Sequence, residues 1–161
     1  MIEWLEGLSA WIETTRLHQT VQTVEWVVPT VQTVHLLAIA AVFGSSLVLA
    51  LRMLRLAGTD WSPAQWQRRL GGWIGLGLVV LLLSGSLLIV GEPGRSLLNF
   101  TFQLKMGLLI GAIIVLMPLA GGMKRLDRPD ARAAMSLRLL AVLLILLWLA
   151  IIACGRWIAY S

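Results

Sequence analysis

The sequence predicts an all-α integral membrane protein, a four-helix bundle with an N-terminal amphipathic interfacial helix. Of its 161 residues, 58% are apolar and only 13% are charged, whereas about 25% of residues are charged in an average soluble domain. Apolar runs occupy residues 27–51, 70–90, 106–123 and 137–153. Each run is close to the ~20 residues that a helix needs to cross a ~30 Å hydrocarbon core. Helices are the expected structure of such runs, because backbone groups in lipid must be satisfied within their own segment.

The chain is expected to form an arm, residues 1–24, followed by a bundle, residues 25–161. The arm carries Trp4, Leu8 and Trp11 on one helical stripe, which is typical of a helix that lies in the membrane surface or against a partner. It lacks the basic start of a secretory signal and has acidic residues instead. The membrane spans are predicted over approximately residues 26–52, 70–91, 104–123 and 137–158.

Basic residues predict the orientation of the bundle. Four arginines lie between the first and second spans and five Lys and Arg residues lie around the loop between the third and fourth, whereas the middle loop has only Arg95. By the positive-inside rule, we expect a multi-pass protein of the bacterial inner membrane with both termini on the periplasmic, extracytoplasmic side. The net charge of +5 then reports topology, and no nucleic-acid partner is expected.

Few residues suggest chemistry. The single cysteine, Cys154, excludes a disulfide within the chain and a cysteine-based metal cluster within one copy. GxxxG spacings at Gly71 and Gly75 and at Gly107 and Gly111 predict close helix packing, either inside the chain or between copies.

His35 is the polar residue that most needs an explanation. It is about nine residues into the first span, or roughly 13 Å deep at 1.5 Å per residue. An ionisable residue at that depth is costly and normally faces the bundle interior with a partner. One possibility is a hydrogen bond across helices to a Ser, Thr or Gln side chain. Another is a ligand, because the topology places the cations Lys105, Arg156 and Arg95 above His35 at the outer side.

A b-type haem fits this arrangement, because imidazole is a common axial ligand of haem iron and the macrocycle is apolar enough to lie between helices. His35 is the predicted metal ligand. Lys105 and Arg156, or Arg95, are predicted to pair with the haem propionates. His18 is a second axial ligand only if the arm folds back over the bundle, and Met106 or an open position on the iron is equally compatible.

Other sites use the same residues. Copper(I) suits His35, Met106 and Cys154, if these side chains lie at one level. A quinone could accept hydrogen bonds from His35 and Lys105 and stack on Trp157 or Tyr160. A protein without any cofactor, in which His35 only bonds to a neighbouring helix, is the remaining alternative.

The layout resembles a family of small bacterial four-helix membrane proteins known only as a domain of unknown function. The resemblance rests on "WVVPTVQTVHLLAIAAVFGSSLVLALRMLRLAG", "SGSLLI", "NFTFQLK" and "GRWIAY", and it covers most of the chain. More distantly, the chain resembles CopD copper-resistance proteins and HemJ-type protoporphyrinogen oxidases, which have a histidine early in a span and a lysine entering a later one. The HemJ resemblance implies haem b with His35 as ligand and Lys105 nearby, and the CopD resemblance implies copper import.

These observations together predict a membrane redox subunit that binds haem b near the outer face. It is expected to pass electrons between a quinone or membrane partner and an extracytoplasmic redox protein. The alternatives are a CopD-like copper-handling protein and a non-catalytic accessory or scaffold subunit of a larger membrane complex. No catalytic residue is predicted, and the protein is expected to contact lipid and to form a homo-oligomer or to join such a complex.

Overall fold

The computed structural model describes the backbone of residues 2–126 and 131–157 and the side chains of residues 3–126 and 135–154. The described residues form helices and no strands. Four helices are long and apolar enough to cross a membrane, and they are α3 (Val27–Met53), α4 (Pro63–Gly91), α6 (Phe100–Lys124) and α7 (Ala131–Trp157). The predicted all-α four-helix bundle is thereby confirmed, and the length and composition of these helices indicate a multi-pass membrane protein.

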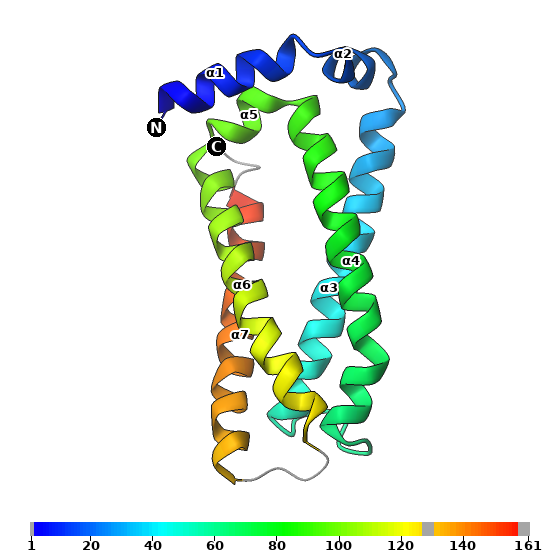
Figure 1. Ribbon diagram of the computed structural model, residues 1–161, viewed down its shortest axis with the longest axis vertical. Coiled ribbons are helices and arrows are strands. Elements are labelled where there is room, and N and C mark those ends of the chain that lie inside the picture. The colour runs from blue at the N-terminus through cyan, green and yellow to red at the C-terminus, as the bar shows by residue number, and fades with distance from the viewer. Residues whose placement is uncertain (1, 127–130, 158–161) are drawn as a thin grey trace.

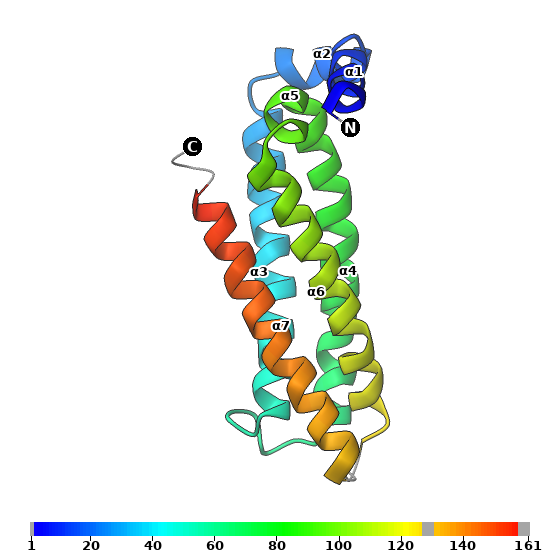
Figure 2. The same ribbon diagram turned by 90° about the vertical axis from the view of Figure 1, so that its left-hand side faces the viewer.

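The bundle consists of two antiparallel pairs, α3 with α4 and α6 with α7 (Figure 1). One end, here called the arm end, carries α1 (Ile2–Glu13), α2 (Arg16–Thr23) and the short α5 (Pro93–Leu97). The opposite end, here called the loop end, carries the segment 54–62 and the last turn of α6. In Figure 2, α7 crosses the bundle obliquely and leans away from the other helices toward the arm end.

The tightly packed core occupies the middle of the bundle and its loop end. Fully buried side chains there include Leu49, Leu119, Met123 and Leu144. By contrast, α3 has no buried residue before Ala38, and α6 has none before Ala112. The buried residues of α3 and α6 are therefore confined to the middle and the loop-end half, whereas α4 and α7 also bury Ser84 and Trp148 toward the arm end.

The arm is two helices, because two threonines interrupt it. The Thr14 hydroxyl donates to the Trp11 carbonyl at 2.7 Å and the Thr15 hydroxyl to the Ile12 carbonyl at 2.6 Å. Thr15 then caps α2, since its oxygen accepts from the backbone N–H of His18 at 3.2 Å. Such local bonds give the backbone an alternative to a continuous helix.

Helix α4 begins at Pro63, seven residues before the predicted start of the second span at residue 70. Ser62 and Gln65 form a capping box, in which the Ser62 oxygen accepts from the Gln65 N–H at 3.2 Å and the Gln65 side chain accepts from the Ser62 N–H at 2.8 Å. Pro63 occupies the first turn, where its missing N–H costs nothing. The polar turn before the apolar run is therefore helical, and it buries Gln67.

Within the chain, α3 and α4 approach closely at Gly77, and of the predicted GxxxG positions a Cβ atom added at Gly111 would meet Leu147 Cδ2 of α7 at 3.9 Å. A Cβ atom added at Gly77 would lie 2.5 Å from Val42 Cγ2, whereas one added at Gly75 or Gly107 would meet nothing within 4 Å. Val42 is β-branched and buried, so its side chain has little freedom to move aside. Among the described residues, Gly75 and Gly107 thus have no helix packed against them.

We expect Gly77→Ala to lower the free energy of unfolding by about 1–3 kcal/mol, the usual cost of overpacking a core. Gly75→Ala is the matched control on the same helix and should not destabilise the protein, because its new methyl group enters open space. Thermal or denaturant unfolding in detergent, followed by tryptophan fluorescence, measures both effects. Equal stability of the two variants would contradict the close approach at Gly77.

Candidate functional site at the arm end

His35 of α3 is hydrogen-bonded across the helix pair to Ser84 of α4, with 2.8 Å between His35 Nδ1 and Ser84 Oγ. Ser84 Oγ also lies 2.6 Å from the Val80 carbonyl and donates to it. A hydroxyl has one proton, so the Ser84 oxygen must accept from His35, and Nδ1 is the protonated nitrogen. The neutral imidazole therefore keeps an unprotonated Nε2, the nitrogen that a metal ligand needs.

Gly85 of α4 lies beside the imidazole ring. A Cβ atom at this position would lie 3.4 Å from His35 Cε1 and 3.9 Å from His35 Nδ1. The Nδ1–Cε1 edge of the ring is thus held along the α4 backbone, while Ser84, which is buried, fixes its rotation. A ligating histidine is typically oriented in this way, by a hydrogen bond from its other nitrogen.

Two further side chains reach this region from the second helix pair. Lys105 of α6 is half-buried and is close enough to His35 for their charges to interact. Cys154 of α7 is also half-buried and lies within electrostatic reach of Lys105. The polar residues of the candidate site, hereafter the His35 cluster, are therefore His35, Ser84, Lys105 and Cys154, one from each membrane helix.

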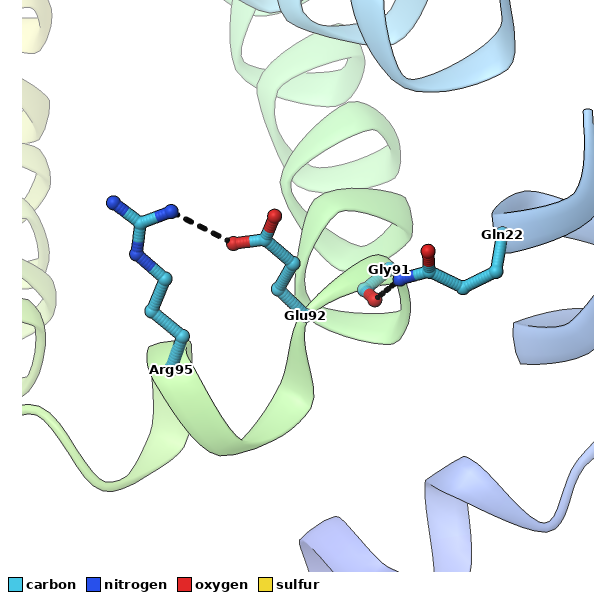
Figure 3. A network of polar contacts seen from close by, with 4 residues as sticks. All are labelled: Gln22, Gly91, Glu92 and Arg95. Carbon is cyan, nitrogen blue, oxygen red and sulfur yellow. Dashed lines mark hydrogen bonds and ion pairs between the residues drawn. The ribbon is translucent and has the colours of Figure 1, made fainter. Parts of the chain in front are cut away.

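The arm folds back over the bundle and is hydrogen-bonded to the end of α4. His18 Nδ1 donates to the Val90 carbonyl at 2.8 Å, and Gln22 Nε2 donates to the Gly91 carbonyl (Figure 3). These carbonyls belong to the last turn of α4, where a helix has no partners of its own for them. His18 and Gln22 are four residues apart and share one face of α2.

His18 does not contact His35 in this arrangement. Their hydrogen-bond partners, Val90 and Ser84, are six residues apart on α4, or about 9 Å along its axis. Two axial ligands on one iron would be only about 4 Å apart, given metal–nitrogen bonds of roughly 2 Å. The observed arrangement thus gives His18 a role in holding the arm, and its predicted role as a second ligand requires α2 to move.

The remaining predicted cations lie elsewhere. Arg95 of α5 is exposed and forms an ion pair of 3.2 Å with Glu92 (Figure 3), so the structure joins it to Glu92 rather than to His35. Arg156 is in the last turn of α7, and its side chain lies outside the described residues, as does Tyr160. Met106 follows Lys105 on α6 and is half-buried.

The candidate ligands of the His35 cluster can be compared with the ligands that haem iron and copper each require. Among the described side chains, no three His, Cys, Asp or Glu residues come together as a metal-binding group. The His35 imidazole offers one donor nitrogen, and a haem iron would bring its four porphyrin nitrogens with it. A copper ion would need Met106 or Cys154 as further ligands.

Ser84 and Gly85 are parts of the site that the sequence analysis did not assign. The signal for them is the small, polar "SGS" at residues 84–86 within an otherwise apolar span. Periodicity places these residues on α4, but it does not give the vertical register of α4 against α3. That register decides which of the small residues faces His35.

No curated protein and no solved structure gives a match to this chain. A family model does match, over residues 8–161, and its description is "Family of unknown function (DUF6644)". The match covers most of the arm and the whole bundle, so the chain belongs to this family of unknown function.

Proposed function

We propose that the protein is a membrane redox subunit that binds haem b between its two helix pairs, with His35 as an axial ligand. The observation that carries this proposal is the hydrogen bond from His35 Nδ1 to Ser84. That bond leaves Nε2 unprotonated and holds the ring in a fixed orientation. A purely structural histidine would form the same bond, so the surroundings of His35 distinguish the two roles.

Two further features favour a ligand. The arm-end halves of α3 and α6, which contain His35 and Lys105, have no buried residue. Lys105, which is costly inside a membrane, is half-buried and close enough to His35 for their charges to interact. An orientated imidazole and a nearby cation together suit a flat anionic cofactor.

In this proposal His35 supplies the axial nitrogen and Ser84 keeps it in the correct tautomer. Lys105 offsets the negative charge of a propionate through a charge-assisted hydrogen bond, and Arg156 is proposed to serve the second propionate from the end of α7. Bound haem b would supply one-electron transfer between a quinol in the membrane and an extracytoplasmic redox protein. The basic residues at the loop end favour a bacterial inner-membrane location with the arm end and both termini periplasmic.

Spectroscopy of the purified protein tests the proposal. After expression with haem supplementation and purification in detergent, the oxidised and dithionite-reduced absorption spectra are recorded together with iron and copper analysis. We expect a Soret band, reduced α and β bands, and about one iron per protein or per oligomeric site. Zinc protoporphyrin IX added to the apoprotein is a second probe, because it reports the pocket without redox chemistry.

Two results would overturn the haem proposal. Bound copper without a Soret band would favour the copper-handling alternative, with Met106 and Cys154 as further ligands. Neither metal, no binding of haem or zinc protoporphyrin, and dependence of a larger complex on this chain would favour an accessory subunit. In that case the His35–Ser84 bond only joins α3 to α4.

A further inference from the structure

The loop end of the bundle contains a pocket away from the His35 cluster. It has a volume of about 420 Å³, and its lining residues are Trp61, Gln65, Arg68 and Arg69. Its lining residues belong to the segment 54–62 and to the first helical turns of α4. That part of the chain is at the bottom of the bundle in Figure 1. The pocket is shallow and widely open to the surface, and no acidic residue of the described part of the chain lines it.

The wall of the pocket is held in place by several contacts. The Arg69 guanidinium carbon lies 4.9 Å from the centre of the Trp61 ring, a cation–π arrangement. Arg52 Nε donates to the Trp61 carbonyl at 2.7 Å, and the Trp61 and Trp66 rings are 5.2 Å apart. A site that is already ordered loses less conformational entropy when it binds a ligand.

The charges of the pocket are available to a ligand. Arg68 and Arg69 are exposed, and within the described part of the chain neither forms an ion pair. Guanidinium groups bind phosphate oxygens through two parallel hydrogen bonds. The chemistry of the pocket therefore matches a phosphate group.

The position of the pocket indicates which kind of molecule would carry that phosphate group. Trp61 and Trp66 stand at the start of a membrane helix, and the exposed Trp73 follows two turns later on α4. Tryptophans gather at the headgroup level of a bilayer. A phosphate site beside such a group of rings lies at the depth of lipid headgroups rather than in open solvent.

We propose that this pocket binds the headgroup phosphate of an anionic phospholipid, with Arg68 and Arg69 on the phosphate and Trp61 against the glycerol region. Lys124 and Arg125, exposed at the same end of the bundle on α6 and its C-cap, are outside the pocket lining. They provide the matched comparison, because removing them deletes the same number of charges.

The test is native mass spectrometry of the full chain released from nanodiscs that contain phosphatidylglycerol and phosphatidylcholine in equal amounts. Wild-type protein should retain phosphatidylglycerol in at least tenfold excess over phosphatidylcholine. Arg68→Gln/Arg69→Gln should lose most of that preference, whereas Lys124→Gln/Arg125→Gln should keep it. Arg68→Gln alone, which breaks no contact within the described protein, should lower the preference severalfold without changing the circular dichroism spectrum.

Three outcomes would overturn the proposal. The first is wild-type protein without a preference for phosphatidylglycerol. The second is an equal loss in both double variants, which would indicate diffuse attraction to positive charge. The third is complete displacement of the lipid by millimolar inorganic phosphate with retention of the phosphate ion, which would indicate a site for a free anion. None of these outcomes depends on haem binding, so the lipid test and the haem test are independent of each other.

Discussion

His35→Ala is expected to abolish haem binding, so that the purified variant shows no Soret band while wild-type protein does. The alanine removes the only imidazole in the His35 cluster, which is the proposed ligand of the haem iron. The fold should survive, because His35 is half-buried and the loss of its bond to Ser84 costs about 1 kcal/mol. Absorption spectra and circular dichroism on the same sample separate loss of haem from loss of structure.

Two control variants sharpen this result. His18→Ala should keep the Soret band, because His18 bonds to the Val90 carbonyl and not to the His35 cluster. Ser84→Ala should keep the haem but bind it more weakly, because the imidazole loses its orientating partner. A Soret band in His35→Ala, or its loss in His18→Ala alone, would contradict the assignment of the ligand.

Trp148→Ala should lower the free energy of unfolding by about 3–5 kcal/mol, as truncation of a large core aromatic does. Trp148 is only 4% exposed, and its ring meets that of Phe43 edge to face with centres 5.4 Å apart. This contact joins α7 to α3, so the variant weakens the junction between the two helix pairs. Denaturant unfolding in detergent measures the effect.

Trp148→Phe distinguishes packing from the polar atom of the indole. Within the described part of the chain, the buried Nε1–H of Trp148 has no hydrogen-bond partner, and phenylalanine removes that group while keeping an aromatic ring. We expect a much smaller loss than for alanine. Leu149→Ala, on the exposed face of the same helix, should have little effect. A cost for Leu149→Ala as large as that for Trp148→Ala would contradict the assigned core.

The membrane helices were predictable because lipid imposes a strong and local requirement. Any run of about 20 apolar residues must satisfy its own backbone, and only a helix does so. The start of α4 was missed because Gln65, Arg68 and Arg69 look like loop residues on hydropathy alone. The capping box of Ser62 and Gln65 is the local signal that marks the helix start.

The candidate site was predictable only in part. His35 and Lys105 stand out because ionisable residues are costly within apolar segments. Ser84 does not stand out, because serine is common in membrane helices and only the register of α4 against α3 brings it to His35. The arm shows the same limit, since its amphipathic pattern does not reveal that the His18 ring bonds to the Val90 carbonyl. Contacts between helices depend on packing that the pattern of one helix does not contain.

The division of the His35 cluster between the two helix pairs has a consequence for biogenesis. His35 and Ser84 belong to the hairpin of α3 and α4, and Lys105 and Cys154 to the hairpin of α6 and α7. Membrane helices insert first and associate afterwards, so each hairpin carries half of the cluster before the halves meet. Two co-expressed fragments, divided in the segment between α5 and α6, should therefore reassemble the complete cluster. A cofactor bound there would then join the two hairpins after each has been inserted independently.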